Sequence, residues 1–418
     1  MFRQHWFASA LLATCLIPNA QAATEPDPSG ASFRDPTEGN WYHPIEPDSW
    51  AHVGAEPAVI EEVLSRIATA EGIRRHPEQP DTLVNYGPGH WIYEWSQAGD
   101  QAQMLAKAAE QNGDQDSAKR LYLAATSYYL RASSPHTDEP ANLAALQQAQ
   151  INYRQAGRYL PVPLQVVEIP FAGQHFKGNL HLPQGNGPFP LIVMSFGSDV
   201  AKEEGMPFFE KQLAPRGIVL LMIDMPGMGD SRAWRITADI DKLHSAAVNY
   251  SRTLANIDSK NIFVMGASFG GTPVARMLLA RPELDLAGLV YICGPIHRPF
   301  MAPAETLEQF PAFTMDGVRT RLGLPPDAPA SAISAKLQPL SLLQQGLLNP
   351  QQPQPRNTPL LILSTNADPV APLADIDLLQ QHSQRSKRLI YDVPGHCPDR
   401  DSREAIAASW VQDQLRSN

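Results

Sequence analysis

Residues 262–271 constrain the fold of this chain more than any other stretch. The apolar residues 262–265 are typical of a buried strand, and they lead directly into a Gly-x-Ser-x-Gly pattern centred on Ser268. A helical pattern follows at residues 272–280. A serine between a strand and a helix in this way sits on a tight, strained turn, and flanking glycines let neighbouring backbone approach closely. The context therefore predicts that Ser268 is an exposed nucleophile.

Short apolar runs alternate with helical patterns over residues 161–418. The first two form an antiparallel pair, and the others have the continuous apolar character of buried parallel strands. The predicted strands are 166–171, 176–182, 191–194, 219–223, 262–265, 289–292, 360–363 and 388–391. This order predicts an α/β catalytic domain with a mostly parallel eight-stranded sheet and helices on both faces. The interval at about 293–357 exceeds what a crossover needs, which indicates a lid-like insertion.

The first 22 residues have the pattern of a secretory signal peptide. A short polar start is followed by a mainly apolar run at 6–17, a proline and the sequence Ala-Gln-Ala. We expect cleavage after Ala22 and a periplasmic or secreted protein. Lipoprotein anchoring at Cys15 is the weaker alternative, because Thr14 is a poor residue before a modified cysteine.

Residues 23–160 precede the predicted sheet. An extended lead-in rich in Pro, Gly, Asp and Glu is followed by helical patterns between about 56 and 159, which indicates a helical cap domain. Trp91, Tyr93 and Trp95 are candidates for the cap side of a substrate pocket. The alternative is that these aromatic residues simply pack in the core of the cap.

Charge and hydropathy limit the partners. The net charge is −10 and no Lys/Arg cluster is present, which argues against nucleic acid or an anionic membrane surface. Beyond the signal no apolar run approaches the ~20 residues of a membrane span, so we expect no stable membrane insertion. The sequence leaves a homodimer open.

A serine hydroxyl needs a base, and the base needs a carboxylate that orients it. On a sheet of this kind they follow the serine along the chain as Asp or Glu and then His, on loops after late strands. Asp368 comes just beyond the strand at 360–363, and His396 lies in a Pro-Gly loop after the last strand. The later aspartates and His382 fall within a helical pattern. The sequence therefore predicts a Ser268–Asp368–His396 triad.

The negative charge that develops on an attacked carbonyl needs N–H donors. We expect one from Phe269, which follows the nucleophile, and one from Gly197 or Ser198 in the loop after the strand at 191–194. No spacing of His, Cys, Asp or Glu suggests a metal site, and we expect no cofactor.

Two cysteines, Cys293 and Cys397, lie beyond the signal. They could pair in an oxidising compartment. Two buried free thiols are the simpler expectation, and we favour it slightly.

Several short stretches resemble the FrsA-type esterase family of α/β-hydrolases. They include Gly89-His90-Trp91-Ile92-Tyr93-Glu94-Trp95, Gly185-Asn186-Gly187-Pro188-Phe189-Pro190, Ala214-Pro215-Arg216-Gly217-Ile218 and Ile223-Asp224-Met225-Pro226, and they cover most of the chain after the signal. The resemblance implies a helical cap over a hydrolase core and hydrolysis of carboxylic esters without a metal or organic cofactor. The export signal departs from the family's familiar members, which look cytosolic.

The sequence thus predicts a serine esterase that acts on a small-molecule ester through an acyl-enzyme on Ser268. Two alternatives stay open. The same triad could cleave a C–C bond in a diketone-like substrate, or the chain could be a non-catalytic periplasmic binding or regulatory protein that kept the fold.

Overall fold

A computed structural model of the chain describes residues 39–417. Its centre is an eight-stranded sheet of order β1-β2-β4-β3-β5-β6-β7-β8. β2 pairs antiparallel with β1 and β4, and all other neighbouring strands are parallel. The predicted fold and all eight predicted strands are confirmed. The strands are β1 (Gln165–Phe171), β2 (Gln174–His181), β3 (Phe189–Ser195), β4 (Val219–Ile223), β5 (Ile257–Ala267), β6 (Gly288–Ile292), β7 (Leu360–Thr365) and β8 (Ser386–Tyr391).

The register of the sheet brings the carboxyl ends of its parallel strands to one edge. Ser195 at the end of β3 pairs with Gly266 of β5, and Ala267 pairs with Ile292 of β6. Thr365 at the end of β7 pairs with Tyr391 of β8. The loops after these strands therefore meet at one edge, where open α/β sheets bind their ligands.

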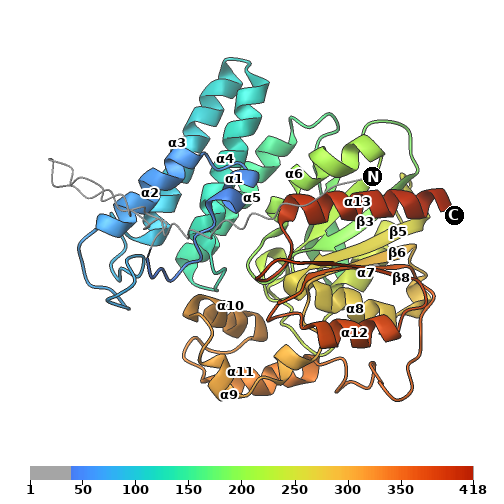
Figure 1. Cartoon of the computed structure of the whole chain (residues 1–418). Coiled ribbons are helices and arrows are strands. Elements are labelled where there is room, and N and C mark those ends of the chain that lie inside the picture. The colour runs from blue at the N-terminus through green and yellow to red at the C-terminus, as the bar shows by residue number, and fades with distance from the viewer. Residues whose placement is uncertain (1–38, 418) are drawn as a thin grey trace, which may run out of the picture.

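Helices cover both faces of the sheet, as Figure 1 shows. The C-terminal helix α13 (Arg400–Ser417) and the short α6 (Met206–Phe208) lie on one face, and α7 (Lys242–Ser251), α8 (Gly271–Ala280) and α12 (Leu373–Gln381) lie on the other. The central strands are buried on both sides, which explains why their sequences are continuously apolar.

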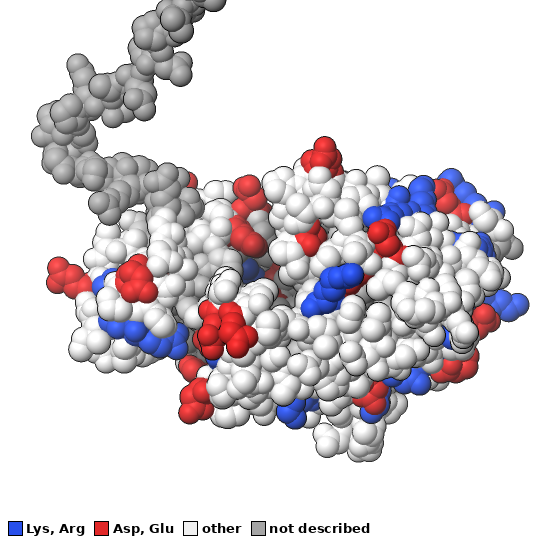
Figure 2. All heavy atoms as spheres, turned by 60° about the horizontal axis from the view of Figure 1, so that its bottom comes forward, with Lys and Arg blue, Asp and Glu red and all other residues white. Residues whose placement is uncertain are grey.

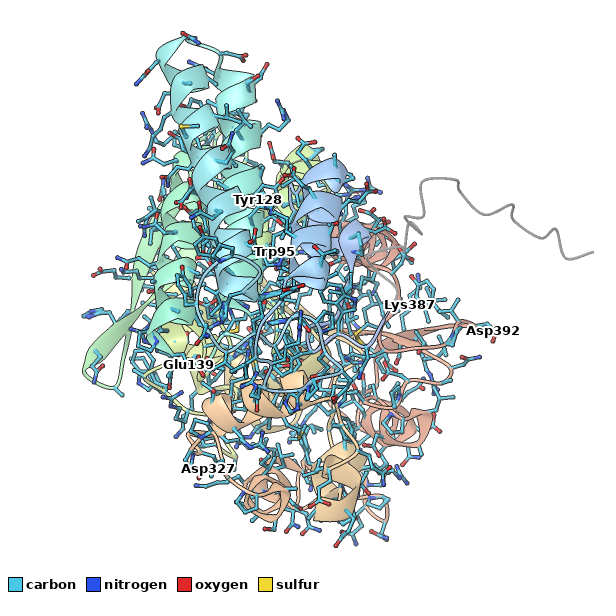
Figure 3. The ribbon with its side chains drawn as sticks, turned by 90° about the vertical axis from the view of Figure 1, so that its left-hand side faces the viewer. Trp95, Tyr128, Glu139, Asp327, Lys387 and Asp392 are labelled. Atoms are coloured by element: carbon cyan, nitrogen blue, oxygen red, sulfur yellow. A yellow bond between two sulfur atoms is a disulfide. The ribbon has the colours of Figure 1, made fainter. Side chains whose placement is uncertain are left out.

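The N-terminal helices stand beside the sheet as a separate cap (Figure 1). They are α1 (Pro47–His52), α2 (Pro57–Thr69), α3 (Trp91–Gln111), α4 (Gln115–Ser133) and α5 (Pro140–Gly157). Small residues let α3 and α4 approach closely: a Cβ on Gly99 would lie 2.8 Å from the Tyr129 ring. In Figure 3 Trp95 and Tyr128 point into the interior of these helices. Trp95 is fully buried there.

The predicted insertion lies between β6 and β7. It contains α9 (Ala304–Leu307), α10 (Ala312–Leu322) and α11 (Ala330–Leu337). Together with Met225, Ile236 and Ile240 of the hydrolase domain, these helices form a small apolar core. That core includes Phe269, whose ring lies 5.7 Å from the ring of Phe300. The insertion therefore packs on the residue that follows Ser268.

Charges of both signs are interspersed on the face shown in Figure 2. Within residues 39–417, no helix combines the length and apolarity that crossing a membrane would require. The predicted signal peptide at residues 1–22 lies outside the described residues.

Candidate active site

Ser268 occupies a tight turn between β5 and α8. Its φ of 54° lies in the left-handed region, which is strained for a side chain other than glycine. The flanking glycines have no room for side chains. A Cβ on Gly266 would overlap the carbonyl oxygen of Gly270, and one on Gly270 would lie 2.5 Å from the carbonyl oxygen of Phe196. The close packing explains why the sequence has glycine at these two positions.

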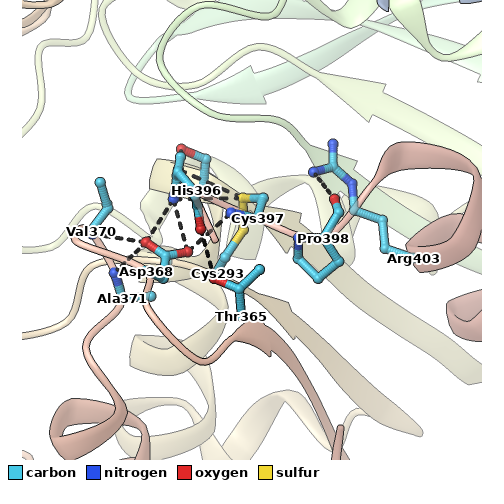
Figure 4. Close-up of a disulfide and its surroundings, with 12 residues drawn as sticks. Cys293, Thr365, Asp368, Val370, Ala371, His396, Cys397, Pro398 and Arg403 are labelled. Atoms are coloured by element: carbon cyan, nitrogen blue, oxygen red, sulfur yellow. Dashed lines mark hydrogen bonds and ion pairs between the residues drawn. A yellow bond between two sulfur atoms is a disulfide. The ribbon is translucent and has the colours of Figure 1, made fainter. Parts of the chain in front are cut away.

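The three residues of the predicted triad form one hydrogen-bonded chain. Ser268 Oγ lies 2.7 Å from His396 Nε2, and His396 Nδ1 lies 2.9 and 3.0 Å from the two carboxylate oxygens of Asp368. Figure 4 shows the contact between Asp368 and His396. Three different loops, after β5, β7 and β8, supply these side chains.

Asp368 is held as an ionised acceptor. Its side chain is fully buried, and its oxygens accept hydrogen bonds from the backbone amides of Val370, Ala371 and Cys397 at 2.8, 3.0 and 3.0 Å. Burial alone raises the pKa of Asp368, but the bonds from His396 and the amides outweigh it, so its pKa lies below the usual value. The His396 side chain is 31% exposed, so its imidazole is accessible from outside.

The loop after β3 reaches Ser268. A Cβ on Gly197 would lie 2.7 Å from Ser268 Cβ, 2.8 Å from its Oγ and 3.5 Å from the backbone nitrogen of Phe269. Only a glycine therefore leaves room beside the serine. The structure brings Gly197 and Phe269, two of the predicted oxyanion residues, to Ser268, with Ser198 next along the loop.

Arg321 and Asp199 were not found from the sequence. Arg321, on α10, is fully buried, and its guanidinium donates to the carbonyl oxygens of Ser198 and Pro135. Asp199 Oδ1 lies 3.8 Å from that guanidinium, and among the described residues it has no hydrogen-bond partner. Burial raises the pKa of Asp199, although Arg321 opposes the shift. Arginines are rarely fully buried, so the sequence of this helix did not single out Arg321.

Cys293 and Cys397 form a disulfide, visible in Figure 4. The expectation of two free thiols is therefore wrong. The sequence placed Cys293 at a strand end and Cys397 after His396, but it did not show that the two loops meet. With Asp368 and His396 these sulfurs form a group whose ligand atoms lie within 4.8 Å of one another. Both sulfurs are bonded to each other, so the group does not fit a metal centre.

The cap is fastened to the loop that follows β3. Lys202, Glu203 and Glu204 are each at most 4% exposed. Glu204 accepts from Arg131 of α4 at 2.7 Å and from Arg400 of α13 at 2.9 Å. A run of three charged residues is usually solvated, so this junction could not be predicted from the sequence.

The predicted cap aromatics have different surroundings. Trp95 is in the cap core, so its predicted role in lining a substrate pocket is wrong. Trp91 belongs to the same buried cluster and is only 2% exposed, but it also borders a cavity of about 960 Å³ between the cap and the insertion, together with Arg75, Arg235 and Asp316. Tyr93 is half-buried, packs edge-on against Tyr86, and is not among the residues around this cavity. None of the triad residues lines the cavity.

Comparison with known proteins agrees with this architecture. The FrsA-like family, described as "Esterase FrsA-like", matches residues 14–416. The chain belongs to this family. An Esterase FrsA from Yersinia pestis is 31% identical over 386 residues, which span 91% of this chain and 90% of that protein. One from Photobacterium profundum is 29% identical over 383 residues, 91% of this chain and 89% of the relative.

A solved structure shows the same arrangement of cap and sheet. The 2,6-dihydroxy-pseudo-oxynicotine hydrolase superposes with a TM-score of 0.71 at 19% sequence identity, covering 89% of this chain and 96% of that one. At this identity the likeness concerns the fold alone. The chain is an α/β-hydrolase of the FrsA-like esterase family.

Proposed function

We propose that this esterase hydrolyses small carboxylic esters through an acyl-enzyme on Ser268. The observation that carries the proposal is the continuous hydrogen-bonded chain from Ser268 Oγ through His396 to a buried, ionised Asp368. A serine is a weak nucleophile, and this arrangement is the one that activates it.

The proposed steps use this geometry. His396 Nε2 takes the proton of Ser268 as the serine oxygen attacks the ester carbonyl, and Asp368 fixes the imidazole through Nδ1. The backbone amides of Phe269 and of the 197–198 loop stabilise the oxyanion. His396 then protonates the leaving alcohol, and a water molecule activated by the same base releases the acid.

The test is an acyl-chain series of nitrophenyl esters with the full chain and its Ser268→Ala variant. Ser65→Ala, on the exposed side of α2, is the matched control. We expect hydrolysis by the wild type and by the control, and a loss of about 10⁴-fold or more in Ser268→Ala. Undiminished turnover by Ser268→Ala would refute the mechanism. Lactones and diketones belong in the same screen, because a C–C hydrolase would prefer the latter.

We also propose that the chain is exported. Two observations support this: the signal pattern of residues 1–22, and the Cys293–Cys397 disulfide, since disulfides persist in oxidising compartments. Fractionation of expressing cells, with N-terminal sequencing of the product, tests it. A chain that starts at Ala23 outside the cytoplasm agrees with export, and an uncleaved cytoplasmic chain contradicts it.

A further inference from the structure

We infer that the Cys293–Cys397 disulfide is a positioning element for catalysis, which holds the imidazole of His396 against Ser268 and Asp368 and makes turnover sensitive to reduction. The inference rests on the function proposed above. In this view the crosslink holds the loop that carries His396, and it does not serve mainly to stabilise the sheet.

One half of the crosslink is a fixed anchor. Cys293 directly follows β6, is fully buried, and its amide donates to the carbonyl of Leu363 in β7 at 2.8 Å. The next residue, Gly294, lies under the nucleophile, because a Cβ there would come 2.9 Å from the carbonyl oxygen of Ser268. Cys293 is therefore held rigidly by the sheet, close to the backbone of Ser268.

The other half is attached to a loop with little packing. Residues 392–395, which precede His396, are all exposed. Polar contacts hold this loop, such as the hydrogen bond that Thr365 Oγ1 donates to the carbonyl of Gly395 at 2.6 Å. A segment with few buried apolar contacts opens readily on its own. A further attachment to the body of the protein is therefore needed to hold this loop in place.

Cys397 supplies this attachment directly beside the imidazole of His396. Its Sγ lies 3.6 Å from Nε2 and 3.8 Å from Nδ1 of His396, so the sulfur packs against the imidazole ring. Its amide donates to Asp368 at 3.0 Å. Its φ of 68° is left-handed, a conformation that a cysteine adopts only when its surroundings impose it. Covalent attachment to Cys293 keeps the residue in this position.

Reduction has a defined course. A thiolate of a dithiol attacks Cys397 Sγ, forms a mixed disulfide and releases Cys293 as a thiolate, which takes up a proton. The second thiol of the reagent then displaces Cys397, which is protonated in turn. Two electrons and two protons pass to the cysteines, and the reagent leaves as its cyclic disulfide.

The experiment uses the full chain with Cys15→Ser, so that Cys293 and Cys397 are its only cysteines. Dithiothreitol is the reductant, and titration of two thiols per chain shows completion. We expect kcat for a short nitrophenyl ester to fall at least tenfold, KM to change less than twofold, and activity to return on reoxidation. In Cys293→Ser/Cys397→Ser we expect the same low kcat, a folded protein by circular dichroism, and no response to dithiothreitol.

A second readout does not depend on ester hydrolysis. The proton shared by His396 Nδ1 and Asp368 should give a downfield NMR signal in the oxidised chain, absent in His396→Ala, and weaken on reduction. If the oxidised chain shows the signal but cleaves no ester, the proposed function fails while the positioning is still tested. Complete reduction with unchanged kcat and signal overturns the inference. Unfolding of both the reduced chain and the double variant overturns it too, because the crosslink would then serve global stability.

Discussion

Ser268 and His396 are positioned in two different ways. Ser268 stands where a strand, a turn and a helix pack so closely that neither Gly266 nor Gly270 has room for a Cβ. His396 stands in an exposed loop, and its position depends on individual bonds to Asp368, on Thr365 and on the disulfide. Backbone packing thus fixes one partner and specific crosslinks fix the other. Substitutions that disturb the packing around Ser268 should therefore lower folding stability, whereas those that disturb the contacts of His396 should mainly lower kcat.

Asp368→Asn should strongly reduce turnover while leaving the fold intact. The amide cannot hold His396 in the required tautomer, and we expect kcat to fall by about 10³–10⁴-fold with little loss of fold. Asp377→Asn, an exposed aspartate on α12, is the control and should retain kcat. Steady-state kinetics with a nitrophenyl ester check this. An Asp368→Asn enzyme within tenfold of the wild type would contradict the assigned role.

A pair of glycine substitutions separates the two modes of positioning. Gly266→Ala forces a methyl group into the backbone of Gly270, so we expect about 3 kcal/mol less folding stability and loss of activity. Gly395→Ala meets no neighbour within 4 Å, and with a φ of 95° it should cost only about 1 kcal/mol while still lowering kcat.

Gly346→Ala is the matched control for that backbone strain. It has an open environment and a φ of 71°, away from the triad, so its stability should fall like that of Gly395→Ala while kcat is retained. Chemical denaturation and kinetics measure both quantities. Equal losses of folding stability in Gly266→Ala and Gly395→Ala would contradict the distinction between positioning by backbone packing and positioning by individual crosslinks.

Arg321→Met tests how the oxyanion loop is held. The change leaves the carbonyls of Ser198 and Pro135 without the arginine as a donor, and we expect a loss of about 2 kcal/mol in stability. The displaced loop should lower kcat by about tenfold. Lys336→Met, exposed on α11, should change neither. Wild-type kcat in Arg321→Met would show that the loop keeps its position without the guanidinium.

Acid alone should lower the stability of the fold, without any substitution. Burial lowers the pKa of His136 to about 3, a shift that Arg321 and Arg131 strengthen, and lowers those of His181 and His244 to about 4. The unfolded chain binds their protons near 6.5, so stability is fully present above that pH and declines as pH falls toward 4. We expect roughly 1–2 kcal/mol lost per histidine between pH 6.5 and 4.5. Urea denaturation across this range measures it, and a constant stability would contradict the assignment.

Much of this architecture could be predicted from sequence because it follows local rules. The strands have continuous apolar runs, the Gly-x-Ser-x-Gly turn needs its glycines for packing, and the order of Ser268, Asp368 and His396 follows from the topology of the sheet. The comparisons show the family and the fold. The catalytic roles of the three residues stay a proposal.

The rest depends on contacts between distant segments. The disulfide joins residues 104 positions apart, and nothing in either sequence neighbourhood reveals the partner. Arg321 reaches Ser198 from the insertion, and Glu204 joins the cap to α13. The aromatic residues of α3 illustrate the same limit, since helical spacing does not tell that Trp91 and Trp95 share the cap core while Trp91 alone also borders a cavity.

The most direct test of the central claim is covalent labelling with a fluorophosphonate, followed by mass spectrometry of the intact chain and its peptides. The reagent reacts with a serine only when an adjacent base activates it. We predict one label per chain, located on Ser268, formed much more slowly in His396→Ala and absent in Ser268→Ala. An unlabelled chain, or a label on another residue, would contradict the account.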